Sequence, residues 1–263
     1  MGEMDLKKII FFDLDNTLHS TKQQRILPNT VKLLEQLYKN PNIELGLATG
    51  RAKNNVGILS NYIHMFKYQI YINGALSYKD NVLKASNPIS KEDVLNILES
   101  ATENNVMTGF LSKEEEFILN PDVNLNVFDE LKISKTRVFT KELLKKHDIY
   151  QVWVFSKVKE DCIKLIEKTN LSHFSWHQGG YDIVDNKTNK ANAIKALLKD
   201  EPDYELIAVG DGQNDIDMIE LADIGVAMDN SRFSELKEKA DHVAPNIELD
   251  QLYDFFLSIK IFS

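Results

Sequence analysis

The chain has 263 residues, of which 43% are hydrophobic and 27% are charged, and its formal net charge is -9. This length can bury a hydrophobic core without cross-links, and the ordinary composition argues against disorder. The acidic balance, with lysines scattered among acidic residues, disfavours nucleic acid as a partner.

The cysteine content and the apolar runs bear on the compartment. Cys162 is the single cysteine, which excludes an internal disulfide and a cysteine-built zinc site and fits a reducing compartment. The segment over residues 1–8 is too polar for a signal peptide, and no apolar run approaches the roughly 20 residues of a membrane-spanning helix. We therefore expect a cytoplasmic protein with no membrane partner; the sequence does not indicate an oligomeric state.

The first part of the chain alternates between strand and helix patterns. A continuous apolar run over 8–14 stops abruptly at acidic residues, as a buried parallel strand does. The order strand, helix, strand then indicates a βαβ crossover. The elements expected here are strands over 8–14, 43–48 and 68–72 and helices over 28–39 and around 52–61.

The last part of the chain repeats this alternation, and the middle differs from both. The two outer parts predict one α/β fold, a doubly wound parallel sheet of the Rossmann-like kind. The middle reads as a separate, inserted α/β domain, in which Ser90 and Asp93 form a partial capping box. We expect core halves over 1–80 and 185–263 and the inserted domain over 81–184. The late elements are helices over 189–199 and 215–221 and strands over 206–209 and 224–227.

The first group of polar residues, Asp13, Asp15 and Thr17, follows the first strand. Ligands bind at this edge of open α/β sheets. Two carboxylates one residue apart repel each other, so a cation or a proton must compensate them. On its own, this Asp-x-Asp pattern is equally compatible with a solvated turn.

A second acidic cluster, Val209–Asp215, lies between a strand and a helix of the second core half. Its glycines allow a tight turn, and carboxylates from several strands suit a small hard cation such as Mg²⁺. A calcium-hand loop fits poorly, because Gln213 and Ile216 stand where an oxygen ligand and a glycine are needed. A dinucleotide fingerprint fails because its third glycine is absent.

Two further features bring positive character to the same edge. Thr49-Gly50-Arg51 follows the second strand and places a hydroxyl and backbone N–H groups at an expected helix start, a natural phosphate cradle. Lys190 opens the helix over 189–199. Considered alone, Thr49 would be interpreted as an N-cap and Lys190 as a surface lysine. Together with Mg²⁺, they would compensate the negative charge of the four aspartates in the two clusters and of an anionic ester.

These residues resemble the haloacid-dehalogenase-like (HAD) hydrolases, and within them the Cof-type (class IIB) phosphatases. Four motifs agree in order and spacing, and strand ends of the Cof-type branch also match. The motifs are Asp13-x-Asp15-x-Thr17, Thr49-Gly50-Arg51, Lys190 and Gly210-Asp211-Gly212-x-Asn214-Asp215, and the strand ends are Asn73-Gly74-Ala75 and Gly225–Met228. The sequence departs from the family pattern at Asn16 and Ala191, where glycine is commoner.

The resemblance implies a phosphatase that acts on a small phosphorylated metabolite, such as a sugar phosphate, with Mg²⁺ as cofactor. Asp13 would attack phosphorus to form an aspartyl-phosphate, and Asp15 would act as general acid and then general base. The metal set would be Asp13, Asp15 through its backbone carbonyl, Asp211, and Asp215, the last holding metal waters or Lys190. The phosphoryl oxygens would be held by Thr49, Gly50, Lys190 and Asn214.

The resemblance also implies that the inserted domain is a mobile C2-type cap that contacts the leaving group. Within it, His173, Trp176 and His177 fit substrate contact and plain packing equally well. His19, near the first motif, is interpreted as a rim residue. Three alternatives to the phosphatase stay open: a phosphotransferase or phosphomutase, a non-catalytic phosphometabolite-binding protein, and, disfavoured by the carboxylate cluster, a dehalogenase.

Overall fold

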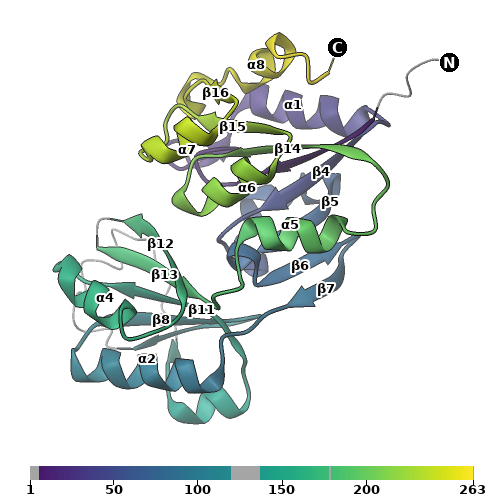
Figure 1. Cartoon of the computed structure of the whole chain (residues 1–263). Helices are drawn as coiled ribbons and strands as arrows, with labels where there is room; N and C mark the ends of the chain where they lie inside the picture. The colour runs from purple at the N-terminus through teal and green to yellow at the C-terminus, as the bar shows by residue number, and fades with distance from the viewer. Residues whose placement is uncertain (1–5, 120–136, 178, 263) are drawn as a thin grey trace. The chain divides into compact units, whose positions relative to one another are not determined.

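The computed structural model describes residues 6–119, 137–177 and 179–262, which divide into two compact units (Figure 1). The first unit holds the chain up to Arg51, Asn55–Ala85 and the chain from Asn189 onward. The second holds Ala52–Asn54 and Ser86–Thr188. The chain thus passes between the units close to residues 86 and 189, whereas the sequence analysis placed the boundaries at 81 and 185.

An eight-stranded sheet forms the centre of the first unit, in the order β16-β15-β14-β1-β4-β5-β6-β7. The neighbours from β16 to β5 pair in parallel, and β6 pairs with β5 antiparallel. The predicted doubly wound parallel sheet is therefore present. Its strands are β1 (Lys7–Phe12), β4 (Ile43–Ala48), β5 (Phe66–Tyr71), β6 (Leu76–Lys79), β7 (Val82–Ser86), β14 (Tyr204–Gly210), β15 (Ile224–Met228) and β16 (His242–Ala244).

Helices cover both faces of this sheet, which explains why β1 is apolar at successive positions. Ile9 and Phe11 pack with one group of helices, and Phe12 on the other face stacks on Phe256 with ring centroids 5.8 Å apart. The first group of helices is α5 (Lys190–Leu198), α6 (Ile216–Leu221) and α7 (Ser234–Lys239), and the second is α1 (Pro28–Lys39) and α8 (Leu252–Ser258).

Among the described residues, no helix has the length and apolar character needed to cross a membrane.

The start of α1 is fixed by a residue from the far end of the chain. Pro28 occupies the first turn, where its missing N–H costs nothing, and Leu27 provides no side-chain cap. The carboxylate of Asp250 instead accepts hydrogen bonds from the backbone N–H groups of Asn29 and Thr30, at 2.9 and 3.1 Å. The predicted helix over 28–39 is confirmed, but its cap is tertiary.

The strand order reverses at β1, which has β4 on one side and β14 on the other. Such a reversal is where open α/β sheets bind ligands, beyond the carboxyl ends of the strands. Asp13, Thr49 and Asp211 come directly after these three strands. The topology therefore gathers the predicted motifs at one edge.

The expected helix around 52–61 is wrong. The chain there makes short 3₁₀ turns, η1 (Lys53–Asn55) and η2 (Gly57–Leu59), followed by η3 (Ile63–Met65). Paired asparagines and a glycine have low helix propensity, so the apolar spacing could not sustain an α-helix. The Thr49-Gly50-Arg51 segment accordingly precedes a 3₁₀ turn and not the start of an α-helix.

The second unit contains a six-stranded sheet in the order β10-β9-β8-β11-β13-β12. Its helices α2 (Lys91–Glu103) and α4 (Lys159–Ile166) pack on a shared apolar cluster that includes Cys162. Ser90 caps α2, because its side chain accepts a hydrogen bond from the backbone N–H of Asp93. The strands are β8 (Met107–Ser112), β9 (Glu116–Leu119), β10 (Arg137–Val138), β11 (Ile149–Phe155), β12 (Ser172–His177) and β13 (Gly180–Val184).

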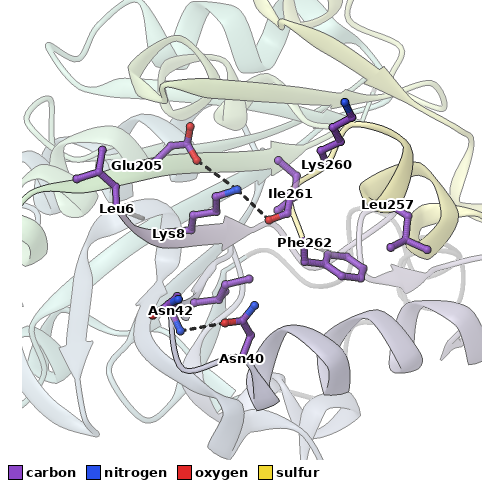
Figure 2. Close-up of a pocket in the computed structure, with 10 residues that line it drawn as sticks. Leu6, Lys8, Asn40, Asn42, Glu205, Leu257, Lys260, Ile261 and Phe262 are labelled. Atoms are coloured by element: carbon purple, nitrogen blue, oxygen red, sulfur yellow. Dashed lines mark hydrogen bonds and ion pairs between the residues drawn. The ribbon is translucent and has the colours of Figure 1, made fainter. Parts of the chain in front are cut away.

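A cavity of about 710 Å³ opens in the first unit at the amino ends of the strands (Figure 2). Lys8, Ile43 and Glu205, which line it, stand near the starts of β1, β4 and β14. The Lys8 Nζ donates to the Ile261 carbonyl oxygen at 2.9 Å and lies 3.6 Å from a Glu205 carboxylate oxygen. This cavity therefore lies at the opposite edge of the sheet from Asp13.

Candidate active site

Lys190 is the centre of the site in the first unit. It is the first residue of α5, whose N-cap Asn189 accepts a hydrogen bond from the backbone N–H of Asn192 at 2.7 Å. Its side chain is fully buried, and Nζ lies 2.6 Å from Oδ1 of Asp13 and 2.6 Å from Oδ1 of Asp215. Burial alone would lower the pKa of Lys190, but the two carboxylates outweigh it and raise that pKa above its usual range. The ammonium therefore stays charged.

The fourth motif folds around the carboxylate of Asp215. Its Oδ2 accepts hydrogen bonds from the backbone N–H groups of Asp211 and Gly212, at 3.0 and 2.8 Å. A Cβ at Gly210 would lie 2.5 Å from Cγ of Asp215, so this close approach requires glycine. The loop thereby turns the Asp211 side chain toward Asp13.

Three carboxylates form a cluster that could hold a metal ion: Asp13, Asp211 and Asp215 each offer an oxygen, all within 4.8 Å of one another. Burial raises the pKa of Asp13 to about 7, with Asp215 adding to the rise and Lys190 opposing it. Burial, followed by the charges of Asp13 and Asp215, raises the pKa of Asp211 well above its usual value. One lysine does not neutralise three carboxylates, so this oxygen-rich set fits a divalent cation.

The carboxylate of Asp15 has different partners. Arg51 binds it through two hydrogen bonds, Nε to Oδ2 at 2.7 Å and Nη2 to Oδ1 at 2.6 Å, and His19 Nδ1 lies 3.0 Å from Oδ1. Burial would raise the pKa of Asp15, but the hydrogen bonds from His19 and Arg51 and the charge of Arg51 together lower it. Sequence reasoning assigned no role to Arg51. The sequence signal for such a cation was the pair of carboxylates, Asp13 and Asp15, separated by one residue, whose repulsion needs compensating positive charge.

Asn73, two residues after the end of β5, hydrogen-bonds to Thr49 and Asn214 and lies close to Gly50. The backbone N–H of Asn73 donates to the Thr49 carbonyl oxygen at 3.1 Å, and Asn214 Nδ2 donates to Asn73 Oδ1 at 2.7 Å. A Cβ at Gly50 would lie 3.0 Å from the same Oδ1. Asn73 is fully buried with a φ of 54°, which asparagine tolerates better than most residues. The Asn-Gly turn signal therefore marks a residue that connects two predicted phosphate-binding segments.

Asn230 is a second connecting residue that the sequence analysis did not identify. Its Nδ2 donates to the Asn16 carbonyl oxygen at 2.9 Å and lies 3.5 Å from Asp211 Oδ2, while its Oδ1 accepts from the backbone N–H of Ile247 at 2.9 Å. It thus ties the loops of the first and fourth motifs together. Asn16 itself has a φ of 59°, which explains why glycine is the commoner residue there and why asparagine can replace it.

Two candidate residues of the second unit, Trp176 and His173, lie in β12 and have ring contacts within their own sheet. Trp176 is 36% exposed, and its ring stacks near Phe155 with centroids 6.3 Å apart. The exposed His173 ring lies 6.1 Å from the Tyr181 ring. The side chain of His177 lies outside the described residues. Substrate contact by these three stays a prediction.

Known proteins match the chain over nearly its whole length. The model of the haloacid dehalogenase-like hydrolase family matches residues 10–256. The chain belongs to this family. Phosphatase YwpJ of Bacillus subtilis (strain 168) is 29% identical over 272 residues, covering 90% of this chain and 94% of that protein.

Solved structures of the same superfamily share the fold. A sugar phosphatase of HAD subclass IIB superposes with a TM-score of 0.85 at 23% identity, covering 97% of this chain and 100% of that chain. A phosphatase from Bacteroides thetaiotaomicron gives a TM-score of 0.87 at 22% identity, covering 100% of this chain and 98% of that chain. At these identities the likeness shows the fold, and the predicted HAD-type fold class is confirmed.

Proposed function

We propose that this hydrolase is a Mg²⁺-dependent phosphatase that cleaves the phosphate monoester of a small metabolite, a sugar phosphate or similar, through a phosphorylated Asp13. The observation that carries the proposal is the Asp13 carboxylate, which buried Lys190 holds at 2.6 Å beside Asp211 and Asp215. The relatives named as phosphatases, one of them a sugar phosphatase, support the reaction class and the substrate class.

The chemistry divides between Asp13 and Asp15. An oxygen of Asp13 attacks phosphorus as the bond between phosphorus and the leaving oxygen breaks. The leaving oxygen takes a proton from the Asp15 carboxyl. Asp15 then removes a proton from water, which attacks the aspartyl-phosphate and releases inorganic phosphate and the free Asp13 carboxylate. Lys190, Thr49, Gly50 and Asn214 are the residues we assign to the phosphoryl oxygens.

The metal set we propose is Asp13 and Asp211 through their carboxylates, Asp15 through its backbone carbonyl, and Asp215 behind them. Burial, together with the charges of neighbouring carboxylates, raises the pKa of Asp13 and of Asp211, and this supports the set because a cation would stabilise both ionised carboxylates. When bound, Mg²⁺ supplies positive charge that lets an anionic ester approach an anionic nucleophile.

The second unit, predicted from sequence over 81–184, is proposed as the cap that selects the substrate. The four motifs lie in the first unit, so the second unit is expected to contribute selectivity and not the reacting groups. Its candidate residues for this role are His173, Trp176 and His177.

Release of inorganic phosphate from an aryl phosphate and from a panel of phosphorylated metabolites tests the proposal. We expect turnover with Mg²⁺, its loss in EDTA, and preference for one class of small metabolite. Transfer of the phosphoryl group to a second metabolite in place of water would support a phosphotransferase. Binding without turnover under every condition would support a non-catalytic phosphometabolite-binding protein.

A further inference from the structure

Asp15, His19 and Arg51 form a hydrogen-bonded set at one edge of the first unit. Arg51 donates to both carboxylate oxygens of Asp15, and His19 Nδ1 meets only Oδ1, at 3.0 Å. The Asp15 side chain is 33% exposed, whereas that of His19 is 5% exposed. The histidine therefore lies beneath the carboxylate, on its buried side, and is not the rim residue that the sequence indicated.

The two oxygens of Asp15 are left unequal by these contacts. Each carboxylate oxygen has two lone-pair positions that can accept hydrogen bonds. On Oδ1, Arg51 Nη2 and His19 Nδ1 fill both, whereas Arg51 Nε is the one donor to Oδ2 among the residues that the structure describes. A proton bound by Asp15 therefore has room on Oδ2 and none on Oδ1.

The backbone fixes His19 against Asp15. The N–H of His19 donates to the Leu14 carbonyl oxygen at 2.8 Å, and its carbonyl oxygen accepts from the N–H of Asn16 at 2.7 Å. His19 also begins β2 (His19–Ser20), which pairs with β3 (Arg25–Ile26). An ionised Asp15 only accepts hydrogen bonds, so the facing Nδ1 carries the imidazole proton.

We propose that His19 is a positioning residue for Asp15, which reserves Oδ2 as the oxygen that gives its proton to the leaving group. As the phosphorus–oxygen bond breaks, the proton leaves Oδ2 and joins the leaving oxygen, and Asp15 becomes a carboxylate. The inference rests on the proposed function and deepens it. Without His19, the proton can occupy either oxygen, so a smaller share of the protonated carboxyl carries the proton on Oδ2.

A leaving-group comparison tests this role. We would measure kcat on an alkyl phosphate, which needs the proton, and on p-nitrophenyl phosphate, which needs it little. His19→Leu should lower kcat on the alkyl ester about tenfold and on the aryl ester no more than about twofold. His19→Asn, whose amide nitrogen takes the place of Nδ1, should restore most of the alkyl activity. Thr21→Val is the matched control, because it removes a hydrogen bond to Asn16 in the same loop without touching Asp15.

The outcomes separate the role of His19 from the phosphatase activity itself. Equal losses on both esters, or His19→Asn no better than His19→Leu, would overturn the role of His19 while leaving the phosphatase in place. If His19→Leu does not fold, His19→Asn is compared with His19→Gln, whose amide reaches the position of Nε2, and the Asn variant must be the faster on the alkyl ester. Wild-type protein that releases phosphate from neither ester would instead overturn the proposed function.

Discussion

Asp13 and Asp15 are separated by one residue, yet their surroundings shift their pKa values in opposite directions. Burial among Asp211 and Asp215 raises the pKa of Asp13 to about 7 despite Lys190. Asp15 is also desolvated, but hydrogen bonds from His19 and Arg51 and the charge of Arg51 lower its pKa. Neighbouring carboxylates with divergent environments are the usual sign of divided roles. Asp13 shares the single charge of Lys190 with Asp215 and lies near Asp211, so its cluster suits a metal, whereas the carboxylate of Asp15 is paired with Arg51.

The largest effect is expected from Asp13→Asn. An amide cannot attack phosphorus but keeps one oxygen, so phosphate release should fall more than about ten-thousandfold while the fold persists. Steady-state assays with circular dichroism measure both. Asp200→Asn, an exposed aspartate on the same unit, is the control. Activity above about a hundredth of wild type would remove Asp13 as the nucleophile.

Lys190→Met should cost about a thousandfold in activity and also reduce stability, because it leaves Asp13 and Asp215 buried without their cation. In EDTA, the free energy of unfolding should fall by about 3 kcal/mol at pH 8. Lys190 opposes the rise in the pKa of Asp13, so that pKa should be higher still in the variant. A carboxyl whose pKa is raised in the folded state binds protons more tightly there, so the stability of the variant should recover as the pH falls from 8 to 6.

Urea unfolding of this variant at several pH values measures the recovery. Lys8→Met, which removes a lysine beside one carboxylate at the opposite sheet edge, should lose less stability than Lys190→Met. A Lys190→Met deficit that stays constant from pH 8 to pH 6 would contradict the clustered-carboxylate explanation.

Asp15→Asn sharpens the comparison, because it removes the proton donor and leaves the nucleophile. The loss should be about a hundredfold on an alkyl phosphate and much smaller on p-nitrophenyl phosphate. The slope of log kcat against leaving-group pKa is the measurement. An unchanged slope would argue that Asp15 is not the general acid.

The smallest effect is expected from Glu44→Gln, which tests whether a lowered pKa by itself marks a functional carboxylate. Hydrogen bonds from Lys67, Lys7 and Tyr68 outweigh burial and lower the pKa of Glu44 to about 2. Its contribution to stability is thus present above about pH 4.5 and is lost as the pH falls toward 2. The variant should lose no more than about 1 kcal/mol at pH 7, lose less at pH 3, and keep wild-type turnover.

The local sequence pattern was enough to predict the helices and strands that carry the motifs. It could not predict features that depend on contacts between segments distant in the chain. The apolar spacing over 28–39 and 43–48 predicted α1 and β4 over the same residues. Residues 52–61 had similar spacing but poor helix formers. The pairing of Asp15 with Arg51 could not be predicted, because 36 residues separate them and only the adjacency of β1 and β4 brings them together.

Some residues of the candidate site could be placed from the sequence and others could not. The sequence placed Asp13, Lys190 and Asp215 at one sheet edge because each adjoins a strand end or a helix start. It gave no sign that Asn230 would link Asn16 to Asp211, since a single amide after a strand has many possible partners.

The first unit is assembled from segments on both sides of the second, and this has a consequence for synthesis on the ribosome. The central strand β1 is made early, but its neighbour β14 is made only after Ser86–Thr188, as is Asp250, which caps α1. The second unit is nearly continuous in the chain, so its sheet has all of its strands while β1 still has one open side. The nascent first half therefore exposes an unpaired edge for about 120 residues of elongation, or roughly 6 to 24 seconds at 5–20 residues per second. Chaperone binding would be expected within that interval.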